Sequence, residues 1–219
     1  MIKNIIFDFD GVLVDSEILA RKAFSRYLFQ KNIQFSEKEF TMKYSGKKLV
    51  EVISKLSSLF NIKDQKVFFN EVMILANDIY IKELTAVSGV KSFLDIITQK
   101  KLIGSNRGKQ SIIEGLKKVD LKKYFNEKDI FSFDMVNSPK PNPDIYLKAI
   151  EVTGIKSNDT IILEDSVIGV KAGVAANIKV IGITSGKHWR DRSILSLQNS
   201  GAYAVAKNFK EVLNIIEEL

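Results

Sequence analysis

The sequence predicts an α/β protein with a parallel sheet and an inserted subdomain made of helices. From residue 89 onward, short apolar segments alternate with segments of helical periodicity, which is typical of a parallel sheet covered by helices on both faces. Between residues 16 and 84 the apolar residues recur at helical spacing, without a convincing strand. We therefore expect a Rossmann-like core formed by residues 1–15 and 87–219, interrupted by a helical subdomain over residues 16–86.

The elements can be placed in order along the chain. The apolar run Ile5-Ile6-Phe7 marks a first strand at residues 2–8. Three apolar stripes predict helices in the insertion, the first through Ala20, Phe24, Tyr27 and Leu28 and the others within residues 49–59 and 67–79. Helices are then expected at 90–98, 111–119, 144–153, 168–176 and 209–219, and strands at 101–104, 130–133, 161–164, 179–183 and 202–206.

Composition and charge exclude several classes of protein. The 219 residues are 45% apolar, which is ordinary for a globular protein, and contain no apolar run long enough to span a membrane. Cysteine is absent, so disulfides and thiolate chemistry are excluded. The net charge of +7 comes from scattered lysines rather than a basic stripe, so nucleic-acid binding is not expected. Because no basic and apolar leader precedes the first strand, we expect a cytoplasmic protein.

Two aspartates follow the first strand directly. Asp8 and Asp10 are two positions apart, and strand geometry would place them on one face. Ligands of open parallel sheets bind beyond the carboxyl ends of the strands, so this position suits chemistry. Two close carboxylates stay ionised only beside a positive charge, and Mg²⁺ prefers such oxygen ligands. A turn that caps the next helix is the alternative for such a pair in isolation.

Matching polar groups follow other predicted strands. Ser105 and Asn106 end the segment that begins at Leu102, Lys140 lies between two prolines, and Glu164-Asp165 ends the strand at 161–164. This order of motifs resembles the haloacid dehalogenase superfamily, and within it the beta-phosphoglucomutase-like phosphatases that carry a helical cap. The resemblance extends over essentially the whole chain. It implies a core that carries catalysis and a cap formed by the insertion.

The resemblance implies a role for each of these residues. Asp8 would be the nucleophile that forms an aspartyl-phosphate, and Asp10 the general acid and base. Ser105, Asn106 and Lys140 would hold the phosphate, whose charge spreads over its oxygens in the transition state. Magnesium would be held by Asp8, Glu164 and Asp165, with the backbone carbonyl of Asp10 also facing the ion. The mechanism needs no histidine, and a plain surface role is expected for His188.

The insertion carries a candidate specificity loop. Gly46, Lys47 and Lys48 open a predicted helix and would favour an anionic substrate, although two solvated lysines are the alternative. With Leu49, this segment is similar to a subgroup that acts on 6-phosphogluconate. The expected substrate is therefore a small phosphorylated metabolite, a sugar phosphate or sugar-acid phosphate, and a monomer is expected.

Two other functions were weighed. Hexose-phosphate mutases of the beta-phosphoglucomutase type carry a histidine in the first cap helix, and the matching position here is Ala20. This departure disfavours the mutase. A binding protein without catalytic activity is disfavoured because every catalytic group of the motifs is present.

Overall fold

The computed structural model describes residues 1–44, 49–189 and 193–219. The chain divides into two compact units, of which the first combines Met1–Asp15 with Thr85–Leu219 and the second is Ser16–Leu84. Each unit has a core of its own and is described by itself.

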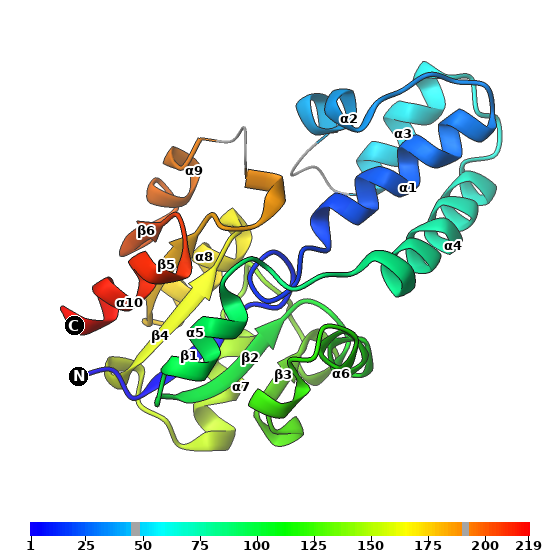
Figure 1. Ribbon diagram of the computed structural model, residues 1–219. Helices are drawn as coiled ribbons and strands as arrows, with labels where there is room; N and C mark the ends of the chain where they lie inside the picture. The colour runs from blue at the N-terminus through cyan, green and yellow to red at the C-terminus, as the bar shows by residue number, and fades with distance from the viewer. Residues whose placement is uncertain (45–48, 190–192) are drawn as a thin grey trace. The chain divides into compact units, whose positions relative to one another are not determined.

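The first unit is built on a parallel sheet of six strands in the order β3-β2-β1-β4-β5-β6 (Figure 1). The strands are β1 Asn4–Phe7, β2 Lys100–Ser105, β3 Ile130–Ser132, β4 Thr160–Glu164, β5 Lys179–Ile183 and β6 Ala204–Ala206. Helices pack on both faces, so the predicted fold class is confirmed. Strand β1 is central, because it pairs with β2 on one side and β4 on the other.

Alternation of side chains along the strands gives the sheet two apolar faces. Ile6 belongs to a buried cluster with Tyr146 and Val170, which come from α7 and α8. Phe7 points the other way, and its ring lies 6.1 Å from that of Phe93 in α5, measured between centroids. The α-helices of this unit are α5 Val90–Ile96, α6 Lys109–Lys118, α7 Asp144–Thr153, α8 Val167–Ala175, α9 Leu195–Gln198 and α10 Phe209–Glu217.

The second unit consists of helices throughout its described part. They are α1 Glu17–Gln30, α2 Glu37–Tyr44, α3 Leu49–Leu59 and α4 Gln65–Glu83. Phe24 stacks on Phe40 at 4.9 Å, which joins α1 to α2. Helix α2 begins with a capping box, in which Glu39 N donates to Ser36 Oγ and Ser36 N donates to a Glu39 carboxylate oxygen.

One predicted core position of α1 is wrong. Ala20 is exposed, and Leu19 and Ala23 are buried with Phe24 instead. The other predicted positions, Tyr27 and Leu28, are buried as well, so the predicted stripe is wrong only in the first turn of α1.

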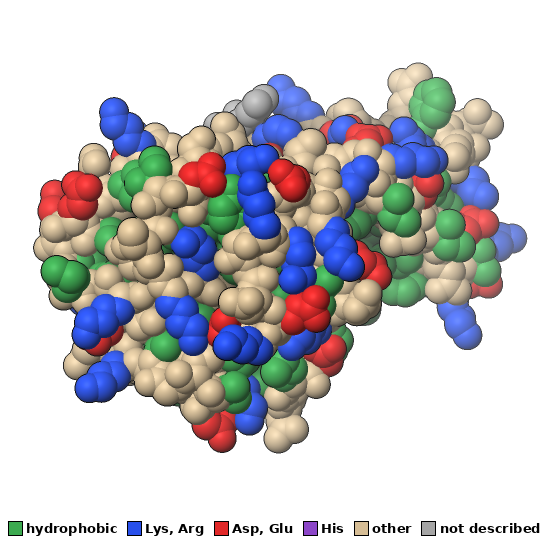
Figure 2. All heavy atoms as spheres, turned by 60° about the horizontal axis from the view of Figure 1, so that its bottom comes forward, with side chains coloured by type: hydrophobic (Ala, Val, Ile, Leu, Met, Phe, Trp, Pro, Cys, Tyr) green, Lys and Arg blue, Asp and Glu red, His purple; other side chains and the backbone are tan. Residues whose placement is uncertain are grey.

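The surface carries charges of both signs. On the face shown in Figure 2, lysine and arginine side chains are spread among aspartates and glutamates rather than gathered into one patch. Within the described residues, no helix is both long and apolar enough to cross a membrane.

Candidate active site

Three strand ends bring polar side chains to one edge of the sheet. Asp8 follows β1, Ser105 is the last residue of β2, and Glu164 is the last residue of β4. The register pairs Phe7 with both Ile103 and Leu163, so Asp8 lies level with Gly104 and Glu164, and Ser105 is one residue further along β2. Parallel pairing of these three strands therefore assembles the candidate site.

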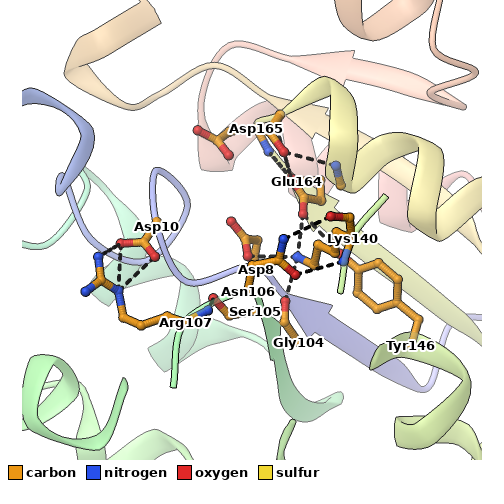
Figure 3. A network of polar contacts seen from close by, with 12 residues as sticks. Asp8, Asp10, Gly104, Ser105, Asn106, Arg107, Lys140, Tyr146, Glu164 and Asp165 are labelled. Atoms are coloured by element: carbon orange, nitrogen blue, oxygen red, sulfur yellow. Dashed lines mark hydrogen bonds and ion pairs between the residues drawn. The ribbon is translucent and has the colours of Figure 1, made fainter. Parts of the chain in front are cut away.

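Lys140 lies at the centre of these groups, as Figure 3 shows. Its Nζ atom is 2.8 Å from Asp8 Oδ1, 2.6 Å from Glu164 Oε1 and 2.7 Å from the carbonyl oxygen of Gly104. An ammonium group has three N–H donors, and each has an acceptor here. The ring of Tyr146 also lies 4.9 Å from Nζ. Burial lowers the pKa of Lys140, but the carboxylates of Asp8 and Glu164 raise it more, so this lysine is charged.

The surroundings of Asp8 shift its pKa in opposite directions. Burial raises its pKa well above the ordinary value, the Glu164 carboxylate raises it further, and the Lys140 ammonium lowers it. A nucleophilic carboxylate must be ionised, so the site requires more positive charge than Lys140 supplies.

The described residues fit a divalent cation at this place. Asp8, Glu164 and Asp165 are all buried and each offers an oxygen, and these atoms lie within 4.8 Å of one another. Three buried carboxylates beside one ammonium leave a net negative charge. Hard oxygen donors with that charge suit Mg²⁺.

Both carboxylate oxygens of Glu164 already accept hydrogen bonds. Oε1 accepts from Lys140 and from the Tyr146 hydroxyl at 3.1 Å. Oε2 accepts from the backbone N–H groups of Asp165 and Ser166 and from the Ser166 hydroxyl, at 3.0–3.1 Å. Direct coordination of a cation by Glu164 would compete with these bonds.

Asp10 points away from this acidic cluster. Strand β1 ends at Phe7 and the chain turns at Gly11, so the alternation of a strand does not extend to Asp10. Its carboxylate accepts from Arg107, with Nε at 2.9 Å from Oδ2 and Nη2 at 2.7 Å from Oδ1 (Figure 3). The backbone carbonyl of Asp10 as a metal ligand stays a prediction.

Sequence reasoning missed Arg107. The residue follows Ser105 and Asn106 in the loop after β2, where it also donates a hydrogen bond to Ser111 Oγ at 3.3 Å. Arg107 could have been predicted from the sequence, because it is a polar residue shortly after a strand, and Ser105 was predicted for the same reason.

The predicted phosphate-binding residues lie close to Lys140. The Ser105 hydroxyl is buried and accepts from Arg107 N at 3.1 Å. The Asn106 side chain pairs with the backbone of Lys140, accepting from its N–H at 2.9 Å and donating to its carbonyl at 3.1 Å. Asn106 therefore fixes the loop that carries the lysine.

Two further predictions have different outcomes. The surface role expected for His188 is wrong, because its side chain is 1% exposed and Nε2 lies 2.9 Å from Asp165 Oδ2. The predicted cap residues Gly46, Lys47 and Lys48 lie outside the described residues.

Comparison with known proteins identifies the family. The profile of the haloacid dehalogenase-like hydrolases matches residues 5–183. The chain belongs to this family. The phosphorylated carbohydrates phosphatase of Thermotoga maritima is 28% identical over an alignment 225 positions long, which covers 98% of each chain. The 6-phosphogluconate phosphatase of Escherichia coli is 27% identical over 192 residues, or 85% of each chain.

A solved structure supports the same assignment. A conserved haloacid dehalogenase-like protein from Agrobacterium tumefaciens superposes with a TM-score of 0.89 at 29% identity, covering 100% of this chain and 99% of its own. Both units of this haloacid dehalogenase-like hydrolase therefore have counterparts in a known fold.

Proposed function

We propose that this hydrolase is a Mg²⁺-dependent phosphatase that cleaves small phosphorylated metabolites through an aspartyl-phosphate. The observation that carries the proposal is the ion-paired cluster of Asp8, Lys140 and Glu164, with Asp165 beside it, at the carboxyl edge of the sheet. The activities named for the two phosphatase relatives support the same reaction.

In the first step, a carboxylate oxygen of Asp8 attacks phosphorus and the bond to the leaving oxygen breaks. Asp10 donates a proton to that oxygen, so the alcohol leaves neutral. In the second step, Asp10 takes a proton from a water molecule that attacks phosphorus. The bond to Asp8 breaks, and free phosphate is released.

The other site residues hold charge. The Lys140 ammonium favours the ionised form of Asp8 and offsets charge on the phosphate oxygens, and the Ser105 hydroxyl and nearby backbone N–H groups bind those oxygens. Asp8 and Asp165 would hold Mg²⁺, with Glu164 binding it directly or through water. When bound, the ion neutralises phosphate charge and balances the buried acids.

We further propose that the helical unit acts as a cap that selects a sugar phosphate or sugar-acid phosphate. Both phosphatase relatives are named for phosphorylated carbohydrates or a sugar acid, which supports this choice. A mutase of the beta-phosphoglucomutase type would need a histidine where Ala20 stands, so hydrolysis is preferred.

Phosphate release from a panel of compounds tests the proposal. The panel includes 6-phosphogluconate, glucose phosphates, phosphoglycolate, nucleotides and pyrophosphate, each assayed with Mg²⁺ and after treatment with a chelator. We expect release from a sugar or sugar-acid phosphate that disappears in Asp8→Asn and in chelator. Asp159→Asn is the matched control, because Asp159 lies at the opposite end of β4, paired with Lys3.

Three results would contradict parts of this proposal. Release from none of the compounds would reject the phosphatase. Interconversion of hexose phosphates with a bisphosphate activator, without net release, would favour the mutase. Full activity after chelation would reject the metal.

A further inference from the structure

His188 occupies a closely fitted place beside the acidic cluster. It lies in the short 3-10 helix Lys187–Trp189 after β5, and its Nε2 is 2.9 Å from Asp165 Oδ2. A Cβ atom built on Gly186 would lie 2.8 Å from the imidazole, and one built on Gly11 would lie 1.9 Å from Asp165 Oδ2. Two glycines thus leave the space in which the histidine and the aspartate meet.

The loop that carries His188 is anchored from a second direction. Asp15 is buried, and its Oδ1 accepts a hydrogen bond from the backbone N–H of Lys187 at 2.9 Å. Trp189 N donates to the carbonyl of Gly186 at 3.0 Å, which closes the turn. The backbone on both sides of His188 is therefore held, so the imidazole has little freedom to leave Asp165.

The chemistry of this contact bears on metal binding. A histidine N–H that donates to one carboxylate oxygen fixes the side-chain rotamer of the aspartate and thereby the direction of both of its oxygens. Groups that bond to metal-ligating carboxylates orient them, and their loss commonly weakens metal binding by about 10–100-fold. Glu164 is fixed by its own five hydrogen bonds, so it does not depend on His188 in this way.

We propose that His188 is a positioning residue that holds Asp165 in place for Mg²⁺ and thereby sets the affinity of the site for the ion. The inference rests on the proposed function in one respect, namely that the acidic cluster binds Mg²⁺. It assigns a role to the histidine that the two-step mechanism does not use.

Calorimetric titration of the metal-free full chain with MgCl₂ tests this role without any substrate. Trp189 is the only tryptophan of the chain, and its ring lies 5.8 Å from the His188 ring, so its fluorescence gives an independent titration. The variants are His188→Leu, which lacks a donor, and His188→Gln, whose amide nitrogen can occupy the position of Nε2. Lys207→Met is the control, because Lys207 is exposed in the loop after β6 and is not one of the groups that hold His188 or Asp165.

The expected result is about 10–100-fold weaker Mg²⁺ binding in His188→Leu, partial recovery in His188→Gln and no change in Lys207→Met. Equal affinity in His188→Leu and the unmodified chain would overturn the inference. If His188→Leu does not unfold cooperatively, His188→Gln is compared with His188→Asn, whose shorter amide cannot reach Asp165. Equal Mg²⁺ affinities of these two variants would overturn the inference.

The unmodified chain separates this inference from the proposed function. If it binds no Mg²⁺, the metal part of the proposed function fails and the role of His188 fails with it. If it binds Mg²⁺ and the variants bind equally well, only the role of His188 is rejected.

Discussion

Replacing Lys140 with methionine tests the electrostatics of the site through the stability of the fold. The substitution keeps a long side chain but leaves Asp8 and Glu164 buried without their shared ammonium. Lys140 and Glu164 are almost fully buried, so solvent cannot replace the lost contacts. Removing one partner of a buried ion pair typically costs about 3–5 kcal/mol. Since domains are stabilised by about 5–15 kcal/mol, Lys140→Met should fold but with a small margin.

The loss should depend on pH in a defined direction. Burial already raises the pKa of Asp8, and loss of Lys140 raises it further. When an acid has a raised pKa in the folded state, the folded state binds more protons than the unfolded chain. The loss of folding stability caused by the raised pKa of Asp8 is therefore absent below pH 3.8, the ordinary pKa of the group. It grows as pH rises and is complete above the raised pKa. Acidification should restore part of the lost stability.

Urea unfolding without metal, followed by Trp189 fluorescence at pH 7.5 and 5.5, measures this effect. Lys148→Met is the matched control, because Lys148 is a partly exposed lysine in α7 paired with Glu151, and it should change stability by no more than about 0.5 kcal/mol. A loss below about 1 kcal/mol in Lys140→Met at pH 7.5, or an equal loss at both pH values, would refute this reasoning.

Three further substitutions are predicted to have distinct effects. Arg107→Met releases the Asp10 carboxylate and should slow turnover of a sugar phosphate by about 10²-fold, but that of p-nitrophenyl phosphate less, because its leaving group needs little protonation. Gly11→Ala strains a residue with φ of +80° and crowds Asp165, so it should weaken Mg²⁺ binding in calorimetry and cost at least about 1–2 kcal/mol in urea unfolding. Tyr146→Phe removes a buried hydroxyl that donates to a carboxylate and should cost about 1.5–3 kcal/mol in the same unfolding assay.

Each of these substitutions has a control or a contradicting result. Equal slowing of both substrates in Arg107→Met would show that the arginine does not act through Asp10. Gly154→Ala shares a positive φ, +67°, but has open space around its Cβ position, so it should leave Mg²⁺ binding unchanged. Tyr124→Phe removes a hydroxyl that donates to Asp95 at an exposed position, and a loss as large as that of Tyr146→Phe would count against the effect of burial.

Much of the fold could be predicted because its signals are local. Strand β5 and helix α7 have the predicted bounds, since an apolar strand run and helical periodicity each end at a turn. Strand β1 is shorter than predicted, because the chain leaves the sheet at Asp8 to form the turn at Gly11.

The clustering of Asp8, Lys140, Glu164 and Asp165 could also be expected, because parallel strands bring their carboxyl ends to one edge. Which side chains pair within the cluster could not be predicted from the sequence. The contact of Arg107 with Asp10 depends on side-chain directions in two loops that are distant in sequence. The burial of His188 depends on space left by Gly11, a residue that the sequence presents only as part of a turn.

The central position of β1 has a consequence for the making of the protein. The strand is the first in the chain, yet its partners β2 and β4 follow much later, with the whole helical unit between β1 and β2. During synthesis Asp8 lacks Glu164 beside it until β4 has left the ribosome. Contacts between residues so distant in sequence form slowly, because a long loop must close first. Enzymatic activity of a growing chain would thus appear only after β4 has joined the sheet.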